Sequence, residues 1–190
     1  MTNVGHPRFP GHVATSLSGH FTVVPGRPGH GAGFPRPCAT CGRGIIEAGD
    51  RPALDPGQHS VSFGAAVRVT HLQAAGESNL VQKGLYNQAG GQYKLQTSNG
   101  VPSCVIAGSR GRIVVQSKTS IADGNWHSVG CSRIRARVTL RVDGTIVGRL
   151  RGQTGVVSNA APVRVGGLGL IKSNDQYHGN LDGVYIRINL

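Results

Sequence analysis

The sequence predicts an all-β protein in which short strands form a sandwich or a barrel. The 190 residues include 30 Gly and 10 Pro but only one Met, which disfavours a helical bundle and favours strands joined by tight turns. From Ile45 onward, apolar runs of strand length alternate with turn residues. The chain is also long enough for one domain that buries its own hydrophobic core.

A change in composition divides the chain into two parts. Residues 1–44 hold nine Gly, six Pro, four His and no acidic residue, whereas all eight Asp and Glu occur from Glu47 onward. We therefore expect a flexible Gly/Pro-rich leader over residues 1–44 and one β-sandwich domain over residues 45–190. Within the leader, only "HFTVV" (His20 to Val24) has the character of a strand.

The strands of the domain are predicted from its apolar runs. Residues 44–48 form the first strand, and a Pro-rich and Gly-rich turn region follows it. In "SVSFGAAVRVTH" the apolar residues alternate as in a half-buried strand; they are Val61, Phe63, Ala65, Val67 and Val69. Further strands are predicted at residues 79–84, 91–97, 103–108, 112–117, 125–132, 138–150, 162–167 and 182–188.

Two local patterns refine this inventory. Asp143 and Gly144 predict a type I′ turn inside residues 138–150, which pairs Val142 with Thr145 and Leu140 with Val147. The best alternative for a helix is "HLQAAGESNLVQKGL", but Gly76 in its middle and the lack of a 3.6-residue period disfavour it.

The formal charge of +12 favours anionic partners. Nucleic acid is not predicted, because no recognition motif or pattern of stacking aromatic residues accompanies the charge. No apolar run approaches the ~20 residues that span a bilayer, so we expect no membrane insertion. The first 20 residues lack the basic-then-apolar pattern of a secretory signal.

The stretch "DGNWHSVGC" (123–131) concentrates chemically interesting side chains. Asp123 and Gly124 predict a turn, and Trp126 opens a strand and is expected in the core beneath that turn. His127 is expected on the opposite face, in phase with Cys131. Because no nucleophile, paired base or orienting carboxylate is spaced around His127, we expect a structural role rather than catalysis.

Two other chemistries are disfavoured by spacing. Cys38 and Cys41 form a C-x-x-C, but the second close ligand pair of a zinc site is missing, and pairing with each other is the simpler interpretation. A glycoside hydrolase needs two carboxylates that face each other across the scissile bond. The only glutamates are Glu47 and Glu77, and no E-x-D-x-x-E motif occurs.

Four arginines form a candidate binding cluster: Arg133, Arg135, Arg137 and Arg141. If the strand phase of an inward-facing Val138 extends back along the chain, their guanidinium groups project together on the outer face. Such a cluster can hold sulfate or carboxylate groups of a polyanion. The alternative is an ordinary solvated surface, with a turn before Val138 that scatters the side chains.

The ordered motifs "ALDPGQHSVSFGAAVRV", "NLVQKG", "IADGNWHSVGCSR", "VTLRVDGTIVG", "NAAPVRVGG" and "YHGNLDGVYIRI" resemble the laminin G-like domain of the concanavalin A-like lectin/glucanase superfamily. The similarity covers residues 45–189 and is greatest to the compact version in secreted actinobacterial proteins. It implies a jelly-roll-like antiparallel β-sandwich, a core position for Trp126, and an exported protein. The front of the chain departs from the family pattern.

The same resemblance implies site residues. It pairs Cys104 with Cys131 in a disulfide, which also favours export. Many relatives bind calcium, and Asp182 occupies a position where some sandwich lectins place a ligand, with Asp175 as a nearby alternative. A simple turn or hydrogen-bonding role for Asp182 is the other interpretation.

These observations predict a non-catalytic binding module, monomeric and secreted, that recognises a glycan or an extracellular protein, including a polyanionic one. Two alternatives stay open. A concanavalin A-like glycoside hydrolase would place carboxylates in a concave groove. A structural accessory domain without a ligand would show no polar or aromatic groove.

Overall fold

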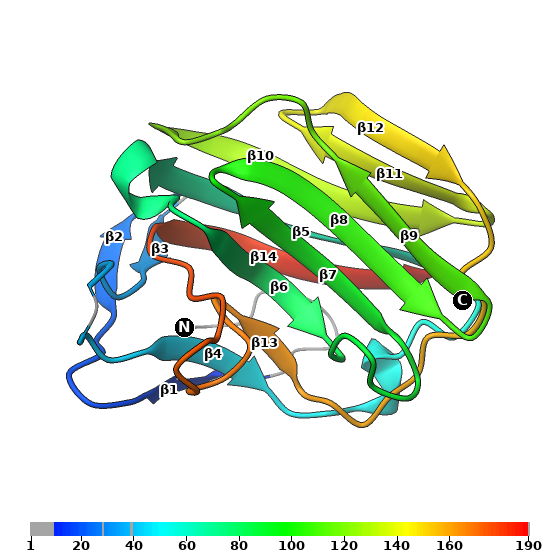
Figure 1. Ribbon diagram of the computed structural model, residues 1–190, viewed down its shortest axis with the longest axis horizontal. Helices are drawn as coiled ribbons and strands as arrows, with labels where there is room; N and C mark the ends of the chain where they lie inside the picture. Colours follow the sequence, from blue (N-terminus) through cyan, green and yellow to red (C-terminus); the bar gives the residue numbers. More distant parts are fainter. Residues whose placement is uncertain (1–9, 28, 39, 190) are drawn as a thin grey trace.

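The computed structural model describes residues 10–27, 29–38 and 40–189, and two antiparallel β-sheets pack face to face in it (Figure 1). The front sheet of Figure 1 has the strand order β1-β4-β13-β6-β7-β8-β9, and the back sheet has the order β12-β11-β10-β5-β14-β3-β2. The strands are β1 (His12–Thr15), β2 (Thr22–Pro25), β3 (His30–Gly33), β4 (Gly44–Ala48), β5 (Ser60–Thr70), β6 (Glu77–Lys83), β7 (Gln92–Ser98), β8 (Val101–Gly108), β9 (Gly111–Gln116), β10 (Asp123–Ile134), β11 (Arg137–Val142), β12 (Thr145–Arg151), β13 (Val163–Val165) and β14 (Asn180–Asn189). The predicted antiparallel β-sandwich is confirmed.

The alternating strand that the sequence predicts lies at the centre of the back sheet. β5 pairs with β10 on one side and with β14 on the other. Phe63 and Val67 are completely buried between the sheets, whereas Arg68 on the alternate face is exposed. The period of two in the sequence therefore separates the core face of this strand from its outer face.

The predicted hairpin turn is present, but one of its two strand pairs is not. Asp143 and Gly144 both have positive φ, at 50° and 78°, and Val142 pairs with Thr145. Leu140 pairs with Gly148 instead of Val147, because a β-bulge next to the turn inserts one extra residue into β12.

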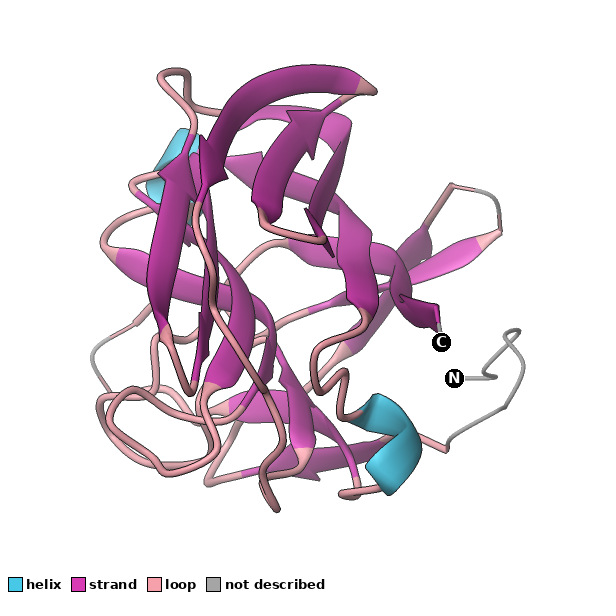
Figure 2. Ribbon diagram, turned by 90° about the vertical axis from the view of Figure 1, so that its right-hand side faces the viewer, coloured by secondary structure: helices cyan, strands magenta, loops and turns pink. Residues whose placement is uncertain are grey.

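Helical structure is limited to two short 3₁₀ turns among the described residues, η1 (Pro52–Leu54) and η2 (His71–Gln73) (Figure 2). The disfavoured helix over residues 71–85 is absent, because η2 is followed directly by β6. No helix in the described ranges is long and apolar enough to cross a membrane.

The described part of the expected leader is structured, which corrects the prediction of flexible chain. β1 pairs with β4 at the edge of the front sheet, and β3 pairs with β14 in the back sheet. Phe34 is 5 % exposed and forms edge-to-face contacts with the rings of Phe21 and Tyr177. Residues 1–9 of that leader lie outside the described residues.

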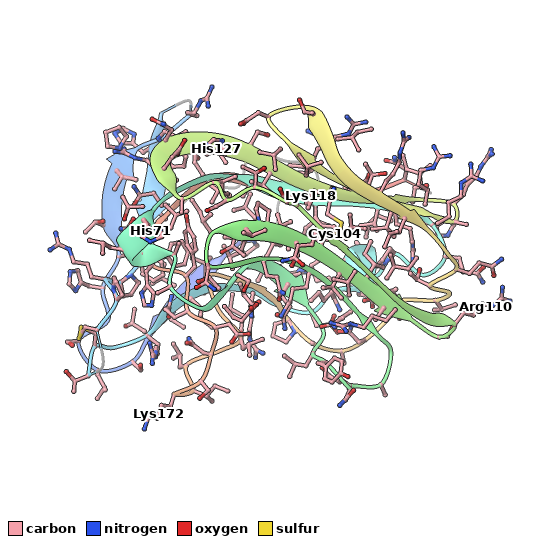
Figure 3. All side chains as sticks on the ribbon, turned by 45° about the horizontal axis from the view of Figure 1, so that its top comes forward. His71, Cys104, Arg110, Lys118, His127 and Lys172 are labelled. Carbon is pink, nitrogen blue, oxygen red and sulfur yellow. A yellow bond between two sulfur atoms is a disulfide. The ribbon has the colours of Figure 1, made fainter. Side chains whose placement is uncertain are left out.

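The hydrophobic core fills the space between the sheets, and a disulfide crosses it. Cys104 on β8 and Cys131 on β10 are joined, with Cα atoms 5.9 Å apart, and Cys104 lies in the middle of the sandwich (Figure 3). The pairing that the resemblance implies is therefore present. Cys38 and Cys41 form a second disulfide, with Cα atoms 5.2 Å apart.

Candidate ligand-binding face

Five arginines share the outer face of the back sheet, and we call this set the arginine face. They lie on β11, β12 and β14 and are Arg137, Arg141, Arg149, Arg151 and Arg187. On β11, Val138 and Leu140 are completely buried in the core, so the alternate residues point outward. On β12, the residues that pair with these outward-facing positions also point outward: Arg149 lies opposite Thr139, and Arg151 lies opposite Arg137.

One row of the arginine face crosses five neighbouring strands. Arg149 on β12 lies opposite Thr139, and the row continues through Ser132 on β10 and Ser62 on β5 to Arg187 on β14. Because neighbouring strands are ~4.8 Å apart, the two terminal arginine backbones are roughly 19 Å apart. The row therefore presents guanidinium groups at both ends and hydroxyl groups between them.

A second row places an aromatic ring beside the arginines. Tyr185 on β14 lies opposite Gly64, which pairs with Gly130 and then with Arg141. A Cβ atom on either glycine would come within 2.9 Å of the Tyr185 hydroxyl, so the phenol lies across both strands. The guanidinium carbon of Arg187 is 5.2 Å from the centre of this ring, within the range of a cation–π contact.

The arginine face carries charge without a carboxylate partner. None of its five arginines forms an ion pair with another residue that the structure describes. Arg137, Arg149 and Arg151 also line a pocket of about 280 Å³ together with Leu150, whose side chain is half exposed. Guanidinium groups without carboxylate partners on one rigid sheet are suited to anionic groups, which they bind bidentately.

The structure places only two of the four predicted arginines on this face. Arg137 and Arg141 lie there, but Arg133 is 3 % exposed and points between the sheets. Arg135 lies in the two-residue turn between β10 and β11, with φ at 52°. This turn reverses the chain, so the strand phase of β11 does not extend back to Arg133. Arg149, Arg151 and Arg187 were missed, although their strands were predicted.

Arg133 connects two loops from the inside. Its guanidinium donates to the carbonyl oxygens of Gly57 (2.8 Å), His59 (2.7 Å) and Gly155 (3.1 Å), and to the hydroxyl of Thr154 (3.0 Å). Burial lowers the pKa of this guanidinium from its usual value. Arg133 is therefore a structural residue and not part of a binding surface.

Trp126 is also placed differently from the prediction. A register shift between Asp123 and Trp126 sets Trp126 opposite Arg68, on the outer face of the back sheet. The residue is half-buried and lies outside the core cluster, and its carbonyl oxygen accepts a hydrogen bond from Arg27. The β-bulge thus moves the indole out of the core position that the turn and the resemblance predicted.

His127 lies between two carboxylates, which corrects the expectation that none is near it. Its Nδ1 is 2.7 Å from an oxygen of Asp143, and its Nε2 is 3.1 Å from an oxygen of Asp123. Partial burial lowers the pKa of His127, but the hydrogen bonds to Asp143 and Asp123 outweigh this effect and raise the pKa overall. Both ring nitrogens are engaged, so the imidazole connects the start of β10 to the β11–β12 turn.

The residues at Asp182 do not fit a calcium site. One oxygen of Asp182 accepts the backbone N–H of Arg27, and the other accepts that of Gly183 at 2.7 Å. Asp175, the alternative ligand, lies 4.0 Å from the ammonium group of Lys94. Calcium takes six to eight oxygen ligands. Among the described residues, no group of three or more His, Cys, Asp or Glu side chains is placed to hold a metal ion.

The two packed antiparallel sheets define the class as a β-sandwich domain. The model of the laminin G domain family matches residues 80–189, more than half of the chain, and the chain belongs to this family. No curated protein sequence matches the chain.

Solved structures share the fold. The binding domain of Paraclostridial Mosquitocidal Protein 1 superposes with a TM-score of 0.69 at 14 % identity over 97 % of this chain and 47 % of that chain. Domain 4 of AbnA, a GH43 extracellular arabinanase from Geobacillus stearothermophilus in complex with arabinotriose, gives 0.68 at 17 % identity over 94 % and 82 %. Domains LG4-5 of the mouse laminin alpha1 chain give 0.58 at 16 % identity over 70 % and 37 %. The chain thus spans about half the length of the mosquitocidal binding domain.

Proposed function

We propose that this protein is a non-catalytic binding module that recognises an acidic glycan at a cell surface or in the extracellular space. The arginine face is the single observation that carries this proposal. Five guanidinium groups without carboxylate partners lie on one rigid sheet, and hydroxyl groups and the Tyr185 ring lie between them. Sulfate or carboxylate groups along a glycan chain have the charge and geometry that arginine binds.

Three further observations support this proposal: the first concerns the extracellular location, the second the lack of catalysis, and the third the binding of a glycan. Laminin G domains and disulfides are typical of extracellular proteins, and two disulfides are present. Several described carboxylates form structural ion pairs: Glu47 with Arg164, and both Asp50 and Asp55 with Lys83. In the structural neighbour from AbnA, the same fold was solved with arabinotriose.

The proposal is tested with heparin as a sulfated probe, because binding through counterion release weakens steeply as salt rises. The test variant replaces Arg137, Arg141, Arg149 and Arg151 with Gln. The control variant removes four exposed charges elsewhere, at Arg36, Arg110, Lys118 and Lys172. Three of these control positions are labelled in Figure 3 and are widely separated on the surface.

Both variants have a formal charge of +8, four less than the +12 of the natural sequence. We expect the test variant to elute from a heparin column at clearly lower salt than the control variant. Equal elution of the two variants would contradict the arginine face. If the natural protein fails to bind heparin and polyuronate at physiological salt, the structural accessory role becomes the better account.

A further inference from the structure

A second open site lies on the front sheet and shares no lining residue with the arginine face. A pocket of about 520 Å³ is formed by the loop before β7 and by the β8–β9 hairpin. We call it the Tyr86 pocket. Its walls carry the ring of Tyr86, the aliphatic side chains of Leu85 and Val156, and the backbone of several glycines. Its polar groups include Asn87, Gln92 and Arg112, and no carboxylate lines it.

Tyr86 offers a free aromatic surface. Its residue is 66 % exposed, although it lies on a loop that is well anchored at both ends. The guanidinium carbon of Arg112 on β9 is 5.1 Å from the centre of the ring, a cation–π contact that holds it in place. An exposed ring held by an arginine is an amphipathic platform for the apolar face of a ligand.

Gln92 is the second observation. It lies on β7 and is only 3 % exposed, yet it lines the pocket. An amide both donates and accepts, so it matches a hydroxyl group, which does the same.

The neighbouring amide of Gln82 supports the loop that carries Tyr86. Gln82 on β6 pairs with Lys94, which lies two positions along β7 from Gln92. The Nε2 of Gln82 donates to the carbonyl oxygen of Gly84 at 2.7 Å. Its own side-chain oxygen is buried and has no partner among the described residues. The amide nitrogen of Gln82 thus fixes the start of the loop, while its amide oxygen has no partner among the described residues.

A buried ion cluster anchors the other end of this loop. The Lys83 ammonium is completely buried and lies 2.9 Å from carboxylate oxygens of both Asp50 and Asp55. It also donates to Asn159, whose side chain donates to the carbonyl oxygen of Gly91 at 2.9 Å. The loop is therefore held in place before any ligand arrives, which lowers the entropic cost of binding.

We infer that the Tyr86 pocket binds a unit of a neutral saccharide chain, with the apolar face of the sugar on Tyr86 and a sugar hydroxyl on the amide of Gln92. The choice of a neutral ligand follows from the lining groups: an aromatic ring, aliphatic side chains, amides and backbone. The one cation of the lining, Arg112, already contacts the aromatic ring. This site is independent of the arginine face and adds a second ligand to the proposed function.

The experiment uses saturation-transfer NMR and calorimetry with the full chain and five neutral hexasaccharides, built from arabinose, xylose, glucose, mannose and galactose units. Tetragalacturonate is the acidic comparison. We expect at least one neutral hexasaccharide to bind, and Tyr86→Ala to weaken that binding roughly tenfold because the stacking surface is lost. Gln92→Leu is expected to weaken it similarly, whereas Tyr86→Phe keeps the ring and stays within about twofold.

Two controls separate this site from the arginine face and from general damage to the fold. The test variant of the heparin experiment should bind the neutral hexasaccharide as the natural protein does. Tyr86→Ala should keep the natural unfolding midpoint and the natural elution from heparin, because Tyr86 is exposed. Binding of no neutral hexasaccharide, binding of tetragalacturonate alone, or binding that Tyr86→Ala leaves unchanged would each overturn the inference.

Discussion

Arg133 is a buried charged residue whose guanidinium hydrogen-bonds to the backbone of two loops. The loop around residues 57–59 and the loop around residues 154–155 do not belong to either sheet, and the Arg133 guanidinium satisfies carbonyl oxygens in both. A carbonyl oxygen left buried without a donor costs free energy comparable to a lost hydrogen bond. Arg133 thereby closes one end of the sandwich.

Replacing this side chain tests its structural role. We expect Arg133→Gln to lower the free energy of unfolding by about 2–4 kcal/mol, since four hydrogen bonds are lost and buried acceptors stay unpaired. Arg135→Gln in the adjacent turn is the matched control and should change it by less than about 0.5 kcal/mol. Urea unfolding of the three proteins measures both values, and equal stability of the two variants would contradict this role.

His127 gives the protein a stability that depends on pH. Hydrogen bonds from the backbone and side chain of Asn125, followed by that from His127, lower the pKa of Asp123 to about 2, so its carboxylate stays charged at pH 5. The raised pKa of His127 means that the folded state binds its proton more tightly than the unfolded chain does. This contribution to stability is complete below the unfolded pKa of about 6.5 and is lost as pH rises through the folded pKa.

The pH prediction compares His127→Asn with the natural protein between pH 5 and pH 9. We expect the difference in unfolding midpoint to be largest at pH 5–6 and to shrink at higher pH, as the imidazolium loses its proton. His71→Asn, at an exposed position of η2, controls for the general effect of losing a histidine. A difference that is constant with pH, or one that grows as pH rises, would contradict the ion-pair explanation.

At the scale of elements, the disulfide between β8 and β10 connects the two sheets through the core. Cys104 pairs with Leu95 and Val115 in the front sheet, and Cys131 pairs with Phe63 and Leu140 in the back sheet. The two cysteines are 27 positions apart in the sequence. The bond therefore restricts a long segment of the unfolded chain while it fixes the spacing of the sandwich.

Removing this bond should be costly. On the chain-entropy model, a closed loop of this length stabilises the folded state by about 3.5 kcal/mol, so we expect the double variant Cys104→Ala/Cys131→Ala to lose roughly that amount. The Cys38–Cys41 disulfide closes a much shorter loop, so the double variant Cys38→Ala/Cys41→Ala should lose clearly less free energy of unfolding. Denaturant unfolding of both variants measures the two losses, and a larger loss for the short loop would contradict the account.

The sequence predicted elements well where one face of a strand is buried and badly at the edges. β5 was predicted from its alternation, and the β11–β12 turn from Asp143 and Gly144, because each signal is local. The edge strand β1 and the short strand β3, next to the edge strand β2, were not predicted, since they obtain their order from the strands they pair with. The β10–β11 turn was predicted only as one of two alternatives, because no Gly or Asn marks the positive φ that Arg135 adopts.

At the scale of the whole molecule, the candidate site was predictable only in its chemistry. Excess arginine suggested an anion-binding surface, and five arginines share the outer face of the back sheet. Its members depend on strand register, which brings Arg187 of β14 into one row with Arg149 of β12. The Tyr86 pocket was not predicted, because Tyr86 and Arg112 come from a loop and a strand that only the fold brings together.

The segment before β4 is an integral part of both sheets, and this leads to the last prediction. Deleting residues 1–37 removes β1, β2 and β3, together with Phe21 and Phe34, and it exposes the unpaired edges of β4 and β14. Loss of a single buried phenylalanine already costs about 3–5 kcal/mol.

We therefore expect the unfolding midpoint of the deleted protein, measured by circular dichroism, to fall by at least about 10 °C. Phe34→Ala should reproduce a large part of this loss, because Phe34 packs against Tyr177 in the core. Val23→Ala on β2, a residue that is 78 % exposed, should leave the midpoint almost unchanged. If the deleted protein instead keeps the natural midpoint, the domain begins near Ile45 and the first three strands contribute nothing to its stability.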